Sequence, residues 1–237
     1  DRDYFALDVV MEGLRRLEYR GYDSAGVAMY SENGVEWRKK AGKVAALEEE
    51  IDNRPLQDSV LGIGHTRWAT HGAPTDANAH PHVVDDGKLA LVHNGIIENF
   101  TELKNELTEK GYEFRSETDT EVAAVLLGDV LHNQAAGDLT RAMQLTCKRF
   151  AGAFTLLAIS ADAPDRIVAA RRDSPLVVGV GEDEMFLGSD VSGFIDYTKT
   201  AVEIDNDRVV TITADGYEVT DYDGTEVEGR KFEIKWD

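Results

Sequence analysis

Apolar residues recur at helical spacing in five segments of the chain. Residues 3–19 place apolar side chains three or four positions apart, which predicts a helix with one buried face. These side chains are Leu7, Val10, Met11, Leu14 and Leu17. Gly21 follows as the stop, since glycine readily adopts the backbone that ends helices. Further helices are predicted over residues 44–51, 99–110, 117–131 and 138–150.

Other segments have the composition and the bounding turns of strands. Two short runs flank the turn Glu32-Asn33-Gly34 and predict a hairpin. The runs that predict strands are residues 25–30, 35–38, 60–64, 89–92, 154–160, 166–171, 176–179, 185–187, 208–213 and 217–222. Strands followed by helices and then by more strands, without repeats or a long linker, predict one α+β domain with layered sheets and helices.

The composition excludes several classes of protein. With 45 acidic and 25 basic residues, the net charge of −20 argues against binding to nucleic acid. No segment approaches the roughly 20 apolar residues of a membrane span, and residues 1–20 lack the basic start of a signal peptide. A single cysteine, Cys147, excludes an internal disulfide, so we expect a cytoplasmic protein with an acidic, solubilising surface.

Three polar clusters follow predicted strands or begin a predicted helix, at residues 65–72, 93–95 and 118–120. Arg67 can hold a carboxylate through two hydrogen bonds, and Asp119 can accept from an amine, which together suit an α-amino acid. The side-chain amide of Asn94 and the backbone N–H of Gly95 could stabilise an oxyanion. Taken singly, residues of these types more often form an Asn-Gly turn, a helix cap and a surface ion pair.

Five histidines lie close together in the sequence and raise the alternative of a metal site. They are His65, His71, His80, His82 and His93. No carboxylate or cysteine stands at familiar ligand spacing, and no H-E-x-x-H helix is present. We therefore expect no metal and no cofactor, and we expect the imidazoles to fix loop geometry through hydrogen bonds.

Cys147, the single cysteine of the sequence, is a candidate nucleophile. It falls in the middle of a predicted helix, and no base stands near it in the sequence. The pattern favours a small apolar role for this side chain.

Several long motifs together resemble one family from end to end. They are residues 12–26, residues 65–72, Asn78 to His82, His93 to Asn99 and Ser116 to Glu121, with Ser174-Pro-Leu-Val177 and Ser189-Asp190 further on. They resemble the glutaminase domain, a class II glutamine amidotransferase domain, of the glutamine–fructose-6-phosphate amidotransferases (glucosamine-6-phosphate synthases). This resemblance implies an N-terminal-nucleophile hydrolase fold of four layers, α/β/β/α, with two stacked antiparallel sheets.

The resemblance also implies a mechanism for glutamine hydrolysis. An N-terminal cysteine attacks the side-chain amide of glutamine, and its own α-amino group, with an ordinary pKa near 7.7–8.0, serves as the base. Asn94 and Gly95 would form the oxyanion hole, and Arg20 would lie near the nucleophile and order the site.

The same resemblance implies which residues bind the substrate. Arg67 would hold the α-carboxylate of glutamine with help from Thr70 and His71, and Asp119 would hold the α-amino group. Trp68 would gate the passage of ammonia to a partner domain. Fructose 6-phosphate would receive the ammonia on a sugar-phosphate isomerase domain of the same longer chain, giving glucosamine 6-phosphate.

Two departures from the family pattern qualify these expectations. The sequence starts at Asp1, whereas the family has a cysteine-bearing strand of about eight residues ahead of this point. It stops at Asp237, where the family continues into the isomerase domains. We therefore expect residues 1–237 to be a glutaminase domain without its first strand, its nucleophile or its isomerase domains.

Two other functions stay open, and so does oligomeric state. The chain could be a glutamine-binding module without catalysis, or the glutaminase domain of another amidotransferase, such as the enzyme that uses phosphoribosyl pyrophosphate. A homodimer is compatible with the sequence.

Overall fold

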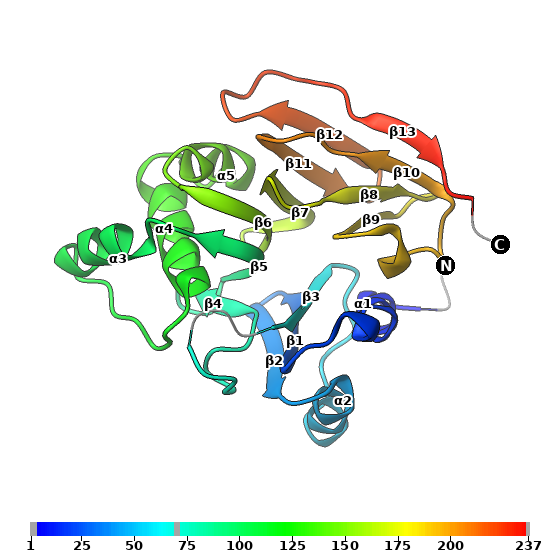
Figure 1. The fold of residues 1–237 in the computed structure, drawn as a ribbon, viewed down its shortest axis with the longest axis horizontal. Coiled ribbons are helices and arrows are strands. Elements are labelled where there is room, and N and C mark those ends of the chain that lie inside the picture. Colours follow the sequence, from blue (N-terminus) through cyan, green and yellow to red (C-terminus); the bar gives the residue numbers. More distant parts are fainter. Residues whose placement is uncertain (1–3, 69–71, 236–237) are drawn as a thin grey trace.

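The computed structural model describes residues 4–68 and 72–235, which fold into four layers in the order helices, sheet, sheets, helices (Figure 1). The first sheet has six strands in the order β12-β11-β7-β6-β5-β4, and all neighbouring pairs are antiparallel. Its strands are β4 (His82–Val84), β5 (Leu89–Ile97), β6 (Gly152–Ser160), β7 (Ala163–Arg172), β11 (Arg208–Thr213) and β12 (Gly216–Asp221).

The second layer of strands consists of two sheets. One has the order β2-β1-β3 and the other the order β13-β10-β8-β9. Their strands are β1 (Ser24–Ser31), β2 (Gly34–Ala41), β3 (Gly62–Arg67), β8 (Val177–Val180), β9 (Met185–Gly188), β10 (Thr200–Glu203) and β13 (Arg230–Glu233). Within the described ranges, β3 pairs only with β1 and β9 only with β8, so each has one free edge.

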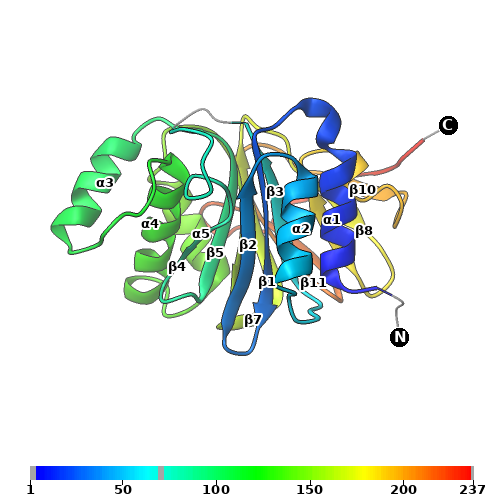
Figure 2. The ribbon, with the colours of Figure 1, turned by 90° about the horizontal axis from the view of Figure 1, so that it is seen from below.

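Helices cover the two outer faces, as Figure 2 shows. They are α1 (Ala6–Arg16), α2 (Val44–Asn53), α3 (Phe100–Glu109), α4 (Asp119–Asn133) and α5 (Leu139–Cys147), with short 3₁₀ turns η1 (Glu18–Arg20) and η2 (Val191–Gly193). Helices α3, α4 and α5 pack on the six-stranded sheet, and α1 and α2 pack on the three-stranded one. None of the helices in the described part of the chain is long and apolar enough to cross a lipid bilayer.

The central core lies between the two layers of strands. Its buried side chains include Ile63 of β3, Val92 of β5, Ala169 of β7 and Val178 of β8. This core requires the strands to present apolar side chains inward, and it fixes which face of each strand points at the interlayer space.

The sequence predicted all five α-helices and the long strands, and the four-layer α+β class is confirmed. It placed one strand at residues 60–64, whereas β3 runs over Gly62–Arg67 and holds the polar residues within the strand. It also ended a strand at Val92, whereas β5 continues to Ile97. The strands β4, β10 and β13, each of three or four residues, were missed.

Candidate active site

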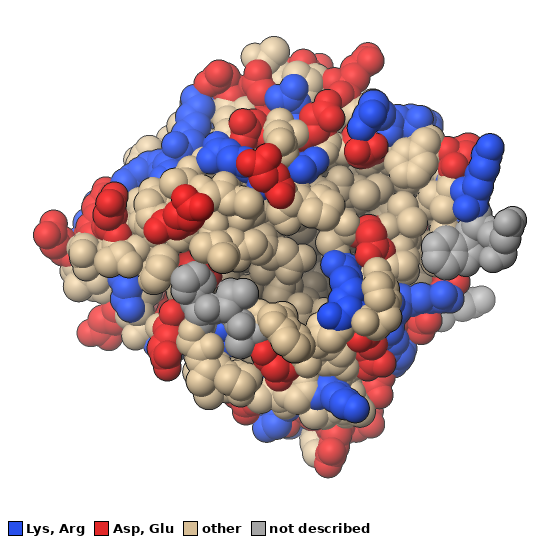
Figure 3. Space-filling model, in the orientation of Figure 1, with Lys and Arg blue, Asp and Glu red and all other residues tan. Residues whose placement is uncertain are grey.

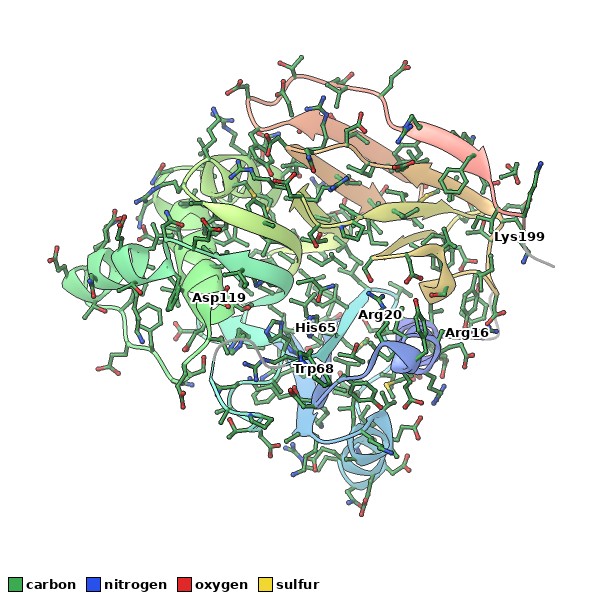
Figure 4. All side chains as sticks on the ribbon, viewed as in Figure 1. Arg16, Arg20, His65, Trp68, Asp119 and Lys199 are labelled. Atoms are coloured by element: carbon green, nitrogen blue, oxygen red, sulfur yellow. The ribbon has the colours of Figure 1, made fainter. Side chains whose placement is uncertain are left out.

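A cavity of about 1190 Å³ opens on the face shown in Figure 3, where the surface is hollowed near its centre. It is lined by β3, β5, η1 and the start of α4, and across from these by residues 183–189 around β9. The predicted site residues in its wall are Arg20, Arg67, Trp68, Asn94, Gly95 and Asp119. Figure 4 places Asp119 and Arg20 on opposite sides, with His65 and Trp68 between them.

Arg67 is the last residue of β3 and its side chain is buried, with 4% of the residue exposed. Its Nη1 donates to the carbonyl oxygen of Ala73 at 3.2 Å, and that oxygen also accepts from Asn78 Nδ2 at 3.0 Å. Burial lowers the pKa of Arg67, while nearby carboxylates, including Asp119, oppose the shift. Because a guanidinium keeps its proton under all ordinary conditions, the cavity wall carries a fixed positive charge.

Asp119 begins α4 and is also buried, at 4% exposure. Its Oδ2 accepts from the backbone N–H of Ile97 at 2.9 Å, and within the described residues Oδ1 makes no hydrogen bond. The helix cap is Thr118, whose Oγ1 accepts from Glu121 N at 3.2 Å, so the interpretation of Asp119 as a cap is wrong. A carboxylate at this helix N-terminus is favoured by the helix dipole and keeps one oxygen for a cationic ligand.

Asn94 and Gly95 lie inside β5, where they pair with Thr155 and Phe154 of β6, so the alternative of an Asn-Gly turn is wrong. Gly95 has φ +118°, a conformation that favours glycine. Asn94 Oδ1 lies 2.7 Å from His65 Nε2. Both residues reach the cavity wall from the six-stranded sheet.

Four buried histidines form a cluster, and three of them, His65, His80 and His93, line the cavity. His65 stacks on His80 with ring centroids 4.1 Å apart, and His80 meets His82 edge-on at 5.2 Å. His82 Nε2 shares a hydrogen bond of 2.8 Å with Thr118 Oγ1, and His93 Nδ1 shares one of 2.9 Å with Thr120 Oγ1. These two hydrogen bonds connect the start of α4 to β4 and to β5.

Burial lowers the pKa of His65 to about 4 and lowers those of His80 and His82 well below the ordinary 6.5. These three imidazoles are therefore neutral near pH 7. Among the described residues, no group of three His, Cys, Asp or Glu side chains is arranged to hold a metal ion. The hydrogen bonds of the cluster show what the rings do instead: they fix the strands and the helix start around the cavity.

Arg20 and Trp68 lie at the mouth of the cavity. Arg20 Nη2 donates to Ser189 Oγ at 2.5 Å and lies 3.3 Å from Asp190 Oδ2. Trp68 is 67% exposed, and its ring approaches the backbone of Gly21 so closely that a Cβ there would lie 3.3 Å from Trp68 Cζ3. Arg20 is thus held toward the cavity by residues that follow β9.

The pair Ser189-Asp190 belongs to the motifs that resemble the family, and the residue types alone did not predict its contact with Arg20. Burial alone would raise the pKa of Asp190, but hydrogen bonds from Ser192 and the charge of Arg20 outweigh burial and lower it. A Ser-Asp step directly after an apolar strand was the signal that could have found it.

Two predicted substrate-binding residues, Thr70 and His71, lie outside the described residues. Cys147 is the last residue of α5 and is fully buried in the core against the six-stranded sheet, and burial raises the pKa of its thiol. It is not among the residues that line the cavity. The only cysteine of the sequence is therefore a core residue, as its position in the helix predicted.

Comparison with solved structures supports the fold assignment. Glutamine phosphoribosylpyrophosphate amidotransferase from B. subtilis superposes with a TM-score of 0.76 at 24% identity, over 92% of this chain and 47% of that one. The fold is that of the N-terminal-nucleophile amidotransferases. This likeness defines the class of protein at the level of the fold.

Sequence comparison identifies the family. The profile described as glutamine amidotransferase domain matches residues 52–227. Glutamine–fructose-6-phosphate aminotransferase [isomerizing] of Corynebacterium diphtheriae is 73% identical over 237 residues, which is 100% of this chain, and that of Streptomyces coelicolor is 57% identical over 232 residues, or 98%. The chain belongs to the glutamine amidotransferase domain family. It spans 38% and 37% of the length of these two relatives.

Proposed function

We propose that the cavity binds L-glutamine, with Arg67 on its α-carboxylate and Asp119 on its α-ammonium group. The observation that carries this proposal is the presence of two opposite charges, each 4% exposed, in the wall of one cavity. A free amino acid is the small ligand that satisfies both charges at once. Thr70 and His71, which follow Arg67 closely in the sequence, assist it in this proposal.

The amide end of the bound glutamine is hydrolysed in this proposal. The α-amino group of an N-terminal cysteine takes the proton of its thiol, the sulfur attacks the side-chain carbonyl carbon, and Asn94 Nδ2 and Gly95 N–H stabilise the oxyanion that forms. The C–N bond breaks, the amide nitrogen takes a proton from the α-ammonium group of the cysteine, and ammonia leaves. Water then attacks the thioester, which releases glutamate and restores the thiol.

The nucleophile in this proposal is an N-terminal cysteine on an extended segment between β3 and β9. Both strands have a free edge among the described residues, and both line the cavity. Free edges of this kind are usually paired or covered. Cys147 is excluded from the role by its place in the core and its raised pKa. Arg20, held by Ser189 at the mouth, orders the site around this segment.

The ammonia passes to fructose 6-phosphate on a sugar-phosphate isomerase domain of the same longer chain, with Trp68 as the gate. This step rests on the names of relatives that are 73% and 57% identical to this chain. The chain spans less than two fifths of the length of each. Those relatives favour fructose 6-phosphate over phosphoribosyl pyrophosphate as the acceptor system. The cytoplasm is the proposed location, because a free thiol nucleophile requires reducing conditions.

A binding module without catalysis is the second candidate, because the buried Arg67 and Asp119 in the cavity wall would hold an amino acid whether or not it is hydrolysed. One experiment separates the two functions. The natural full-length protein is incubated with L-glutamine, glutamate release is measured between pH 6 and 9, and binding is measured by calorimetry. Release of glutamate supports the enzyme, and binding without release supports the module. If folded protein shows neither release nor binding, both proposals are overturned.

A further inference from the structure

Among the described residues, the side chain that holds the amide of Asn94 is that of His65. Nε2 of His65, on β3, lies 2.7 Å from Oδ1 of Asn94, on β5, so the contact joins the two layers of strands. Within the described residues, Asn94 Nδ2 makes no hydrogen bond, and the residue lines the cavity. Its oxygen is thus occupied on the protein side, and its NH₂ group is left for whatever the cavity holds.

The surroundings of His65 decide which nitrogen carries the proton. In the described part of the chain, His65 Nδ1 is buried and has no hydrogen-bond partner. A buried N–H without an acceptor costs more than an unused lone pair, so the proton belongs on Nε2. Nε2–H then donates to Asn94 Oδ1. The flipped amide would set two donors against each other, so the His65 tautomer also fixes the orientation of Asn94.

His65 is itself held in place from below. Its ring stacks on His80 at 4.1 Å with 15° between the planes, and both residues are less than a tenth exposed. His80 Nδ1 accepts from the backbone N–H of His93 at 3.3 Å, one residue before Asn94. The two imidazoles therefore fix the side chain of Asn94 and the backbone that carries it.

We propose that His65 is a positioning residue for the oxyanion hole: through its Nε2–H···Oδ1 contact it turns the Asn94 amide so that Nδ2 points at the reacting carbonyl. The proposal rests on the proposed glutamine hydrolysis. In this proposal His65 lines the cavity but transfers no proton. It acts by keeping one of the two oxyanion donors in the orientation that the reaction needs, before the substrate arrives.

The first test compares variants of the natural full-length enzyme. Loss of one oxyanion-hole donor typically costs 10²–10³ in kcat, so His65→Leu, which only releases that donor, should lower kcat roughly 10- to 100-fold. The KM for L-glutamine should stay within about twofold, because Arg67 and Asp119 are untouched. His65→Gln, whose amide NH₂ can reach the same oxygen, should recover most of the loss. His132→Leu, at an exposed histidine, is the matched control.

A double-mutant cycle separates positioning from packing. In an Asn94→Ala background, His65→Leu should lower kcat by less than about twofold further, because the donor that it orients is gone. An equal loss in both backgrounds, or a loss confined to KM, would overturn the proposal. If the parent enzyme releases no glutamate, the proposed function fails instead, and the cycle is not informative about His65.

A second measurement needs no variant. The ¹⁵N chemical shifts of the His65 ring in the folded protein report which nitrogen is protonated, and the expected pattern is a protonated Nε2 with a bare Nδ1 between pH 6 and 8. Finding the proton on Nδ1 would overturn the proposal even if His65→Leu does not fold. This result is independent of whether the protein hydrolyses glutamine.

Discussion

The backbone of Gly95 leaves no room for a side chain. A Cβ at this position would lie 2.1 Å from the carbonyl oxygen of Ala153, and φ is +118°. Neither the clash nor the strain can be read from the sequence, because the partner atom belongs to a strand 58 positions away along the chain. The Asn-Gly step looked like a turn for that reason, although it forms the middle of a strand.

Gly95→Ala tests this steric requirement. The substitution should lower the free energy of unfolding by about 2–4 kcal/mol, the sum of overpacking and of positive-φ strain. Gly137→Ala is the matched control, because Gly137 also has positive φ (+85°) but has no atom within 4 Å of the added Cβ. Urea unfolding should show the smaller loss, about 1 kcal/mol, for the control. Equal losses in the two variants would refute the steric argument.

Arg67 is the residue whose function the sequence predicted most directly. Its neighbours could not be predicted, because the Ala73 carbonyl and Asp119 come from a loop and from a distant helix start. Charge, by contrast, is evident from the residue type alone. The ligand class therefore stays a prediction from residue type, and the structure adds burial, which would strengthen an interaction with a charged ligand.

Arg67→Ala should raise the KM for L-glutamine in the natural full-length protein by roughly 10- to 150-fold, since one charge-assisted hydrogen-bond anchor contributes about 1.5–3 kcal/mol. Arg54→Ala, at an exposed arginine paired with Glu50, removes the same charge from a remote helix end and should leave KM unchanged. Steady-state glutamate release measures both. A KM within twofold of the parent value for Arg67→Ala would contradict the assignment of the α-carboxylate.

At the scale of elements, the start of α4 shows how one helix terminus is used twice. Thr118 caps the helix and shares a hydrogen bond with His82 on β4, and the next residue, Asp119, receives the backbone N–H of Ile97 from β5. The sequence pattern found this helix because Val122, Val125 and Leu126 form a buried stripe. The pattern did not identify Thr118 as the N-cap, because more than one residue type within 117–121 can cap a helix.

Thr118→Ala should destabilise this junction. The loss of the cap and of the contact with His82 should lower the free energy of unfolding by about 1–2 kcal/mol. Thr118→Ser keeps a hydroxyl in the same place and should retain most of it. Thr108→Ala, on the exposed surface of α3, removes a threonine hydroxyl that does not cap a helix and serves as the control in urea titrations. If Thr118→Ala leaves the free energy of unfolding unchanged, water replaces the Thr118 hydroxyl as the hydrogen-bond partner, and the cap does not stabilise the helix.

The loop before β4 is fixed by an element that the sequence did not connect with it. Lys39 of β2 donates from Nζ to the carbonyl oxygens of Ala77, Ala79 and Pro81, at 3.3, 2.9 and 3.2 Å. The loop places His80 against His65. Such contacts bring together residues about 40 positions apart, and no local pattern of apolar and polar residues encodes them.

The whole molecule combines a strongly acidic surface with a buried group of neutral histidines. Acidic and basic side chains are interspersed over the face in Figure 3, with 45 acidic against 25 basic residues in the sequence. Net charge was evident from composition. The burial of the imidazoles was not evident from composition, because histidine occurs both in the interior and on the surface of proteins. Only the packing around these histidines shows that they are buried.

These histidines should make the fold sensitive to acid. Their pKa values are lowered in the folded state, so the unfolded chain binds more protons as the pH falls below about 6.5. The sign is therefore fixed: their contribution to stability is complete above pH 6.5 and is lost as the pH falls toward 4. Each contributes a slope of at most about 1.4 kcal/mol per pH unit. The carboxylates of Asp129 and Asp190 have pKa values below 3.8, so their contribution is lost only at lower pH.

Protonation also reduces the self-repulsion of a chain with net charge −20, which acts in the opposite direction. Salt screens that surface effect but hardly reaches buried groups, so urea unfolding at about 0.5 M salt and pH 7, 6 and 5 isolates the histidines. His82→Gln keeps the contact with Thr118 and should reduce the slope of stability against pH by about one proton's worth. Thr108→Ala, which removes no titratable group, should leave the slope unchanged. If His82→Gln and the parent protein lose stability in parallel, the buried imidazoles are not the groups that take up the protons.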